Sequence, residues 1–127
     1  MNKEQLDSIL GLSCEERYDY FLSQVGEEKE IWILVNSENQ FLKISADDDG
    51  FEYLPIWPQS EFAINYCKNS KDLVPKSISL PEFLEKWVTG LKKDGLEVGV
   101  FPGSDTNLWV MEPSELKNDL QDELSNF

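Results

Sequence analysis

The longest apolar run in the chain is Ile31-Trp32-Ile33-Leu34-Val35. An unbroken run of branched and aromatic side chains is typical of a buried β-strand, and we predict a strand over residues 30–36. The run is far too short to cross a bilayer, and the polar first residues lack the pattern of a signal peptide. We therefore expect a cytoplasmic protein, with no membrane contact, whose other segments pack around this strand.

Helix signals surround the predicted strand. The capping pattern Ser-x-x-Glu occurs twice, at residues 13–16 and 79–82, and each occurrence predicts a helix start. The first of these helices should end at Gly26, and the second should bury Trp87 with its apolar stripe. Ser60 is expected to cap a further helix. In chain order, the predicted helices lie before residue 11 and over residues 14–25, 61–69, 80–93 and from 113 onward.

Short alternating segments predict the strands. Besides residues 30–36, these are residues 40–44, expected to pair back as a hairpin, and residues 52–57, 77–79, 96–101 and 108–111. Because strands and helices are interspersed without repeats, we predict an α+β fold, with a mixed, mostly antiparallel sheet of about five or six strands covered by helices. A chain of 127 residues fits a single domain over residues 1–127.

The charge and the residue types limit the chemistry. There are 25 acidic and 11 basic residues, which gives a net charge of −14. This charge disfavours nucleic-acid binding and favours a protein partner, which in one version of the hypothesis has a basic surface. The absence of histidine excludes Ser-His-Asp and Cys-His catalytic sites. No catalytic, cofactor-binding or metal-binding residue is predicted, and a monomer or a small homo-oligomer fits equally well.

Clustered carboxylates offer two candidate sites. Asp47, Asp48 and Asp49 precede Gly50, but their spacing does not match a calcium loop, so a solvated acidic turn is the expected structure. Glu97 and Glu112 lie at the ends of apolar strands, and an exposed strand face and a helix start explain them more simply.

Trp57 and Pro58 form the most distinctive non-catalytic feature. A Trp at a strand end beside proline suits a half-exposed binding position, whereas a core position is the alternative. With the acidic turn, the candidate interaction surface is Asp47, Asp48, Asp49, Trp57 and Pro58. A small-ligand-binding protein or a carboxylate-based enzyme with a cleft near Trp57 is the alternative function.

Several segments together resemble the bacterial domain-of-unknown-function family 2750. They are Glu15-Glu16-Arg17-Tyr18-Asp19-Tyr20-Phe21, Leu54-Pro55-Ile56-Trp57-Pro58, Phe62-Ala63, Pro75-Lys76-Ser77-Ile78-Ser79-Leu80, Glu82-Phe83-Leu84, Lys86-Trp87, Gly90-Leu91, Asp94-Gly95 and Val98-Gly99-Val100-Phe101-Pro102. The resemblance implies a small bacterial cytoplasmic protein and no reaction. The order of elements is also similar to the amino-terminal domain of the SseB family, which implies a role in protein contacts. The acidic composition, the absence of histidine and the lack of a nucleotide or metal motif lead us to expect a non-enzymatic protein-interaction module.

Overall fold

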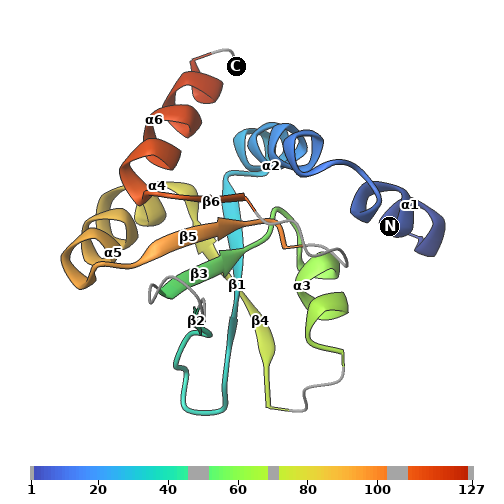
Figure 1. Ribbon diagram of the computed structural model, residues 1–127, viewed down its shortest axis with the longest axis horizontal. Coiled ribbons are helices and arrows are strands. Elements are labelled where there is room, and N and C mark those ends of the chain that lie inside the picture. The colour runs from blue at the N-terminus through green and yellow to red at the C-terminus, as the bar shows by residue number, and fades with distance from the viewer. Residues whose placement is uncertain (1, 46–51, 69–71, 103–108, 126–127) are drawn as a thin grey trace.

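The computed structural model describes residues 2–45, 52–68, 72–102 and 109–125. Figure 1 shows helices surrounding the strands. The helical segments are α1 (Lys3–Leu10), α2 (Cys14–Glu28), α3 (Ser60–Tyr66), α4 (Leu80–Glu82), the π-helix η1 (Phe83–Trp87), α5 (Val88–Asp94) and α6 (Pro113–Leu124). The strands are β1 (Glu30–Val35), β2 (Ile44–Ser45), β3 (Glu52–Ile56), β4 (Val74–Ser79), β5 (Glu97–Val100) and β6 (Trp109–Met111).

The described strands form two sheets. One pairs β1 with β4 in antiparallel orientation, and the other has the order β2-β3-β5-β6. Only β3 and β5 are parallel within the described residues, with Leu54 opposite Val98, whereas β2–β3 and β5–β6 are antiparallel. The predicted α+β class with mostly antiparallel pairing is confirmed, although the strands are divided between two sheets.

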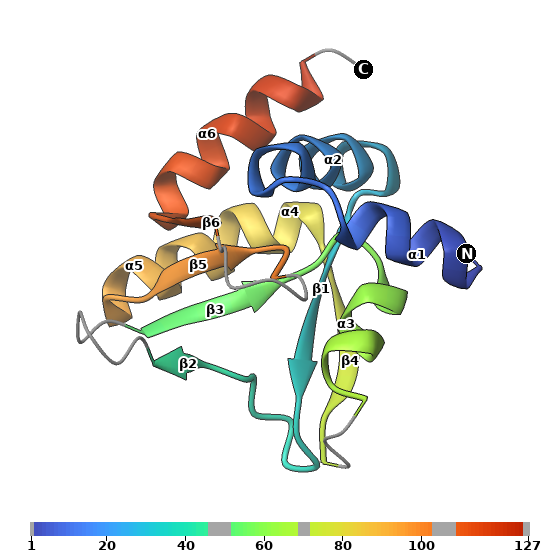
Figure 2. The same ribbon diagram turned by 45° about the vertical axis from the view of Figure 1, so that its right-hand side comes forward.

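A pair of backbone hydrogen bonds joins the two sheets. The amide of Trp32 donates to the carbonyl oxygen of Trp57, and the amide of Trp57 donates to that of Trp32, both at 2.9 Å. From this point β1 and β3 diverge, as Figure 2 shows, and the chain between β1 and β2 connects their far ends. The junction therefore determines where that connection lies.

The helices cover the sheets from several sides. Helix α6 packs on α2 and α5, whereas α3 packs on β1 and β4. Side chains from both sheets and from the covering helices form one hydrophobic cluster, in which Phe21, Val25, Ile33, Leu54 and Val98 are completely buried. No helix in the described part of the chain is long and apolar enough to cross a membrane.

The first capping box forms as predicted, but the helix that it starts continues past its expected end. The Ser13 hydroxyl oxygen accepts from the Glu16 amide at 3.1 Å, and a Glu16 carboxylate oxygen accepts from the Ser13 amide. Helix α2 runs through the buried Gly26 and ends at Lys29, whose φ is 62°. Packing of this glycine inside the protein outweighs a helix penalty of about 1 kcal/mol.

Two other local predictions were wrong. The segment 40–44 makes only one bridge back to β1, between Val35 and Phe41, and its end forms β2, which pairs with β3 instead. Ser60 lies inside α3 and its hydroxyl donates to Glu61, while Gln59 occupies the capping position without a side-chain hydrogen bond. Both differences arise because tertiary pairing outweighs a local signal.

Arg17 is a buried cation that ties the amino-terminal helices to the end of β5. Its side chain is 1% exposed and donates to the carbonyl oxygens of Leu10 at 3.4 Å, Leu12 at 2.8 Å and Phe101 at 3.3 Å. Phe101 has a φ of 54°, a strained value for a bulky residue, and its amide donates to Ile56. The guanidinium thus holds the turn after β5 in a conformation that the chain would not adopt alone.

We expect Arg17→Ala to lower the free energy of unfolding by about 3 kcal/mol or more, because several buried carbonyl groups lose a charged donor. Chemical denaturation measures this loss. Ser23→Ala, at an exposed position of the same helix, should change stability by less than about 0.5 kcal/mol. A loss below about 1 kcal/mol for Arg17→Ala would contradict the role given to this side chain.

Candidate functional site

Of the residues predicted as an interaction surface, the structure describes Trp57 and Pro58, and both are buried. Asp47, Asp48 and Asp49 lie outside the described residues. The side chain of Trp57 is 0% exposed, and Pro58 is buried beside it. The indole nitrogen donates to the carbonyl oxygen of Pro102 at 3.3 Å. The core alternative for Trp57 is therefore correct, and its indole offers no surface to a partner.

The same burial affects the predicted cleft. Trp57 lines none of four surface hollows in the described part of the chain. Glu97 and Glu112 do come together, since both line one hollow of about 240 Å³ beside Lys92. No group of three or more His, Cys, Asp or Glu among the described residues is placed to hold a metal ion.

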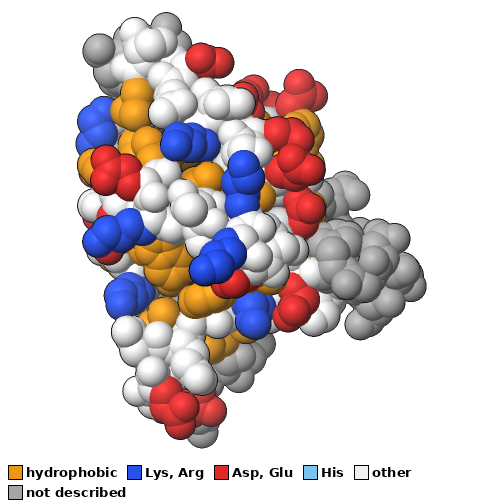
Figure 3. Space-filling view, turned by 90° about the vertical axis from the view of Figure 1, so that its left-hand side faces the viewer, with side chains coloured by type: hydrophobic (Ala, Val, Ile, Leu, Met, Phe, Trp, Pro, Cys, Tyr) orange, Lys and Arg blue, Asp and Glu red, His pale blue; other side chains and the backbone are white. Residues whose placement is uncertain are grey.

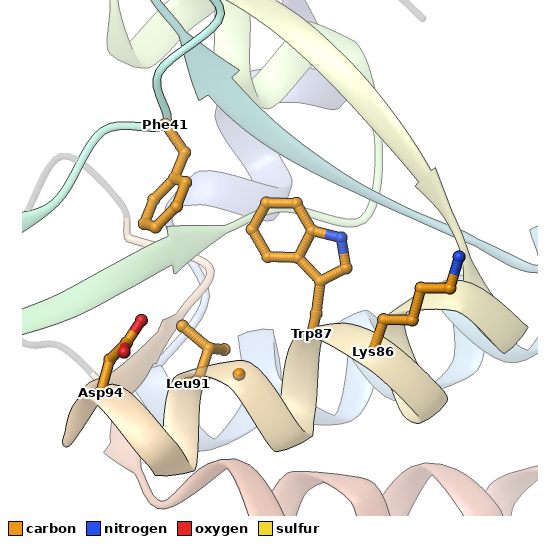
Figure 4. A pocket seen from close by; sticks show the side chains of 6 residues that line it. Phe41, Lys86, Trp87, Leu91 and Asp94 are labelled. Carbon is orange, nitrogen blue, oxygen red and sulfur yellow. The ribbon is translucent and has the colours of Figure 1, made fainter.

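The site that the structure does present is a hollow of about 230 Å³ between α5 and the β1–β2 connection, which we call the aromatic hollow. Its lining residues are Phe41, Lys86, Trp87, Gly90, Leu91 and Asp94. Figure 4 shows the rings of Phe41 and Trp87 next to each other, and both line the hollow. Their centroids lie 5.4 Å apart with an interplanar angle of 64°, an edge-to-face arrangement. Both side chains are only partly buried.

Backbone contacts hold Phe41 in this position. The Val35–Phe41 bridge ties the connection to the end of β1, and the Leu42 amide donates to the Leu34 carbonyl oxygen at 2.8 Å. The wall that Phe41 provides is thus anchored to β1 both at this residue and at the next one.

Trp87 reaches the hollow from an irregular helix. The sequence predicts a regular α-helix with Trp87 in its buried stripe, but the segment Phe83–Trp87 is a π-helix, in which the Val88 amide donates to the Phe83 carbonyl oxygen. Phe83 and Val88 are buried, whereas Trp87 is only partly buried and packs against the core, so its predicted core position holds only in part. Short π-helical turns are rare and frequently occur at functional sites.

Gly90 lies among the residues that line the hollow, and its lack of a side chain is not required by the chain's own packing. A Cβ atom placed on it would meet no atom within 4 Å. Glycine inside a helix costs about 1 kcal/mol relative to alanine. The glycine therefore leaves empty space in the hollow at a cost to helix stability, which favours a role toward something outside the chain.

Lysine side chains gather on this side of the protein. Figure 3, which faces the side of Figure 1 on which α5 lies, shows them spread over the surface with apolar side chains between them. A second hollow shares Phe41 and includes Lys43, and a third lies along Pro81, Leu84 and Leu124 beside Lys29 and Lys117. Four lysines and two acidic residues, Glu85 and Asp94, line these three hollows. Basic residues therefore outnumber acidic ones here, whereas the whole chain has 11 basic and 25 acidic residues.

Comparison with known proteins places the chain in a family. The model of the family described as "Protein of unknown function (DUF2750)" matches residues 18–120. The chain belongs to the DUF2750 family. The match includes every residue that lines the aromatic hollow, and the predicted resemblance is confirmed. No curated protein matches the chain. The likeness to the SseB amino-terminal domain stays a prediction.

Two glycine substitutions test the account of the hollow. Gly90→Ala should raise the free energy of unfolding by about 0.5–1 kcal/mol, because alanine favours the helix and meets no neighbour. Gly95→Ala, at the end of the same helix, should lower it by about 1 kcal/mol or more, because Gly95 has a φ of 72°. Thermal and chemical denaturation check both. A destabilised Gly90→Ala variant would show that internal packing requires this glycine.

Proposed function

We propose that this DUF2750 protein is a non-enzymatic protein-interaction module and that the aromatic hollow is the centre of its contact surface. The observation that carries the proposal is the partly buried pair of Phe41 and Trp87, which line one hollow with Gly90. Large aromatic side chains in a hollow are the usual centre of an interface, where truncation of a single one costs about 2 kcal/mol or more.

The proposal extends to the partner and the location. The net charge of −14 supports a protein partner with a basic surface elsewhere in the contact, and it disfavours nucleic acid. Asp47, Asp48 and Asp49 are proposed as one acidic contact for such a surface. The resemblance to bacterial cytoplasmic proteins supports the same compartment here, with the module acting as a monomer or a small homo-oligomer.

A second candidate function rests on the hollow lined by Glu97 and Glu112. Two carboxylates beside Lys92 are a composition that general acid–base chemistry or a polar small ligand uses. This candidate replaces the predicted cleft near Trp57, because the Trp57 side chain is buried. It has less support, since clustered acids are common on a surface with this net charge.

Affinity capture separates the two candidates. The tagged full chain is incubated with lysate of its own host at low and moderate salt, and the bound proteins are identified by mass spectrometry. We expect one stoichiometric partner for the wild type, and we expect Phe41→Ala and Trp87→Ala to lose it, because each removes a wall of the hollow. Circular dichroism confirms that each variant is folded.

Thr89→Ala is the matched control, because Thr89 is exposed on the same helix and does not line the hollow. It should retain the partner. Recovery of the same partner with all three variants would refute the aromatic hollow as the contact surface. No partner at either salt would refute the interaction module and favour the hollow of Glu97 and Glu112.

A further inference from the structure

We propose that the aromatic hollow binds an extended segment of a partner protein with a defined charge pattern. One large apolar side chain of the segment packs over Gly90 against the adjoining rings of Phe41 and Trp87, with an acidic residue opposite Lys86 and a basic residue opposite Asp94. The inference rests on the proposed function and specifies the partner's chemistry at the same site.

The volume of the hollow favours a single side chain as its occupant. At about 230 Å³ it is smaller than the roughly 300–1,000 Å³ of typical small-molecule pockets. Its lining is largely apolar, with two aromatic rings and Leu91. Gly90 leaves open space in the wall that the helix provides. An aromatic or large aliphatic side chain fits this combination of walls.

The charges lie at opposite ends of the hollow. Figure 4 shows the Asp94 carboxylate on one side of the two aromatic rings and the Lys86 side chain on the other. These are the two charged residues that line it. A segment with an apolar side chain between an acidic and a basic residue is therefore complementary to the hollow. A segment with two acidic residues would place one of them beside Asp94, and a segment with two basic residues would place one beside Lys86.

The spacing of the charges favours an extended chain. Lys86 and Asp94 are eight positions apart along the helix, a distance of about 12 Å at 1.5 Å per residue. An extended segment advances about 3.3 Å per residue, so its residues i and i+4 are about 13 Å apart. Residues i, i+2 and i+4 share one face of such a segment. The predicted pattern therefore has a large apolar residue with an acidic residue two positions to one side and a basic residue two positions to the other, and either chain direction fits it.

The probes are blocked five-residue peptides, which are too short to form stable helices. The test peptide is Glu-Ala-Phe-Ala-Lys, and the matched peptides replace Phe by Ala, or carry Glu at both ends, or carry Lys at both ends. Binding to the full chain at physiological salt is followed by the NMR shifts of the Trp87 indole N–H and the Gly90 amide. The exposed Thr89 amide serves as the local reference.

We expect the test peptide to shift the Trp87 and Gly90 signals and to bind at least about tenfold more tightly than the peptide without Phe. Each matched peptide with equal end charges should bind about threefold to fivefold more weakly, the size of an exposed ion pair. Gly90→Leu, which fills the hollow, should abolish the shifts. Unchanged shifts with Gly90→Leu, or no shifts at millimolar peptide, would overturn the inference.

Charge-swap variants give the sharpest test. Asp94→Lys should reverse the preference toward the peptide with Glu at both ends, and Lys86→Glu should reverse it toward the peptide with Lys at both ends. The pattern would be refuted if the wild type bound the peptide with Lys at both ends most tightly and Asp94→Lys left this preference unchanged. Such a result would show that the net charge alone attracts the peptide. If partner capture still depends on Phe41 and Trp87 in that case, the proposed function stands without this inference.

Discussion

The paired backbone hydrogen bonds between Trp32 and Trp57 are the contact on which the architecture depends. They bring together one end of β1 and the end of β3, and from there the two strands diverge. The β1–β2 connection runs from the far end of β1 to β2, which pairs with the far end of β3, and Phe41 in this connection packs on Trp87. Without this junction the far ends of the two sheets would not be held in this arrangement, and the aromatic hollow would lose one of its walls.

The two sides of this junction differ in how completely their side chains are buried and hydrogen-bonded. At the ends of β3 and β5, Arg17 and Trp57 donate to consecutive carbonyl groups, those of Phe101 and Pro102. No fully buried side-chain nitrogen or oxygen in the described residues lacks a hydrogen-bond partner. The opposite side leaves aromatic surface partly exposed at Phe41 and Trp87. Ile64, Tyr66 and Val74 are more exposed but line none of the four hollows, whereas Phe41 and Trp87 meet in one, which is why we place binding there.

Local signals predicted the start of α2, the strand at residues 30–35 and the α+β class, because capping and apolar runs act within a few residues. The exposure of the tryptophans was not predictable in this way. Trp57 donates to the Pro102 carbonyl oxygen and packs on Tyr66, contacts that the tertiary fold creates. Trp87 is the last residue of a π-helical turn, which spacings of three and four residues do not reveal. The signal in the sequence that could have indicated the site was Gly90, a glycine within a helical segment three residues after Trp87. The structure shows no close neighbour at the position of its missing Cβ.

The most direct test of the aromatic hollow as a contact surface is photo-crosslinking inside cells that express the protein. A photoreactive phenylalanine analogue replaces Phe41, whose ring lines the hollow, and separately replaces the exposed Thr89. If the aromatic hollow is the contact surface, position 41 forms a discrete adduct with one partner protein and position 89 forms much less. Equal adducts from both positions, or adducts from position 89 alone, would contradict it.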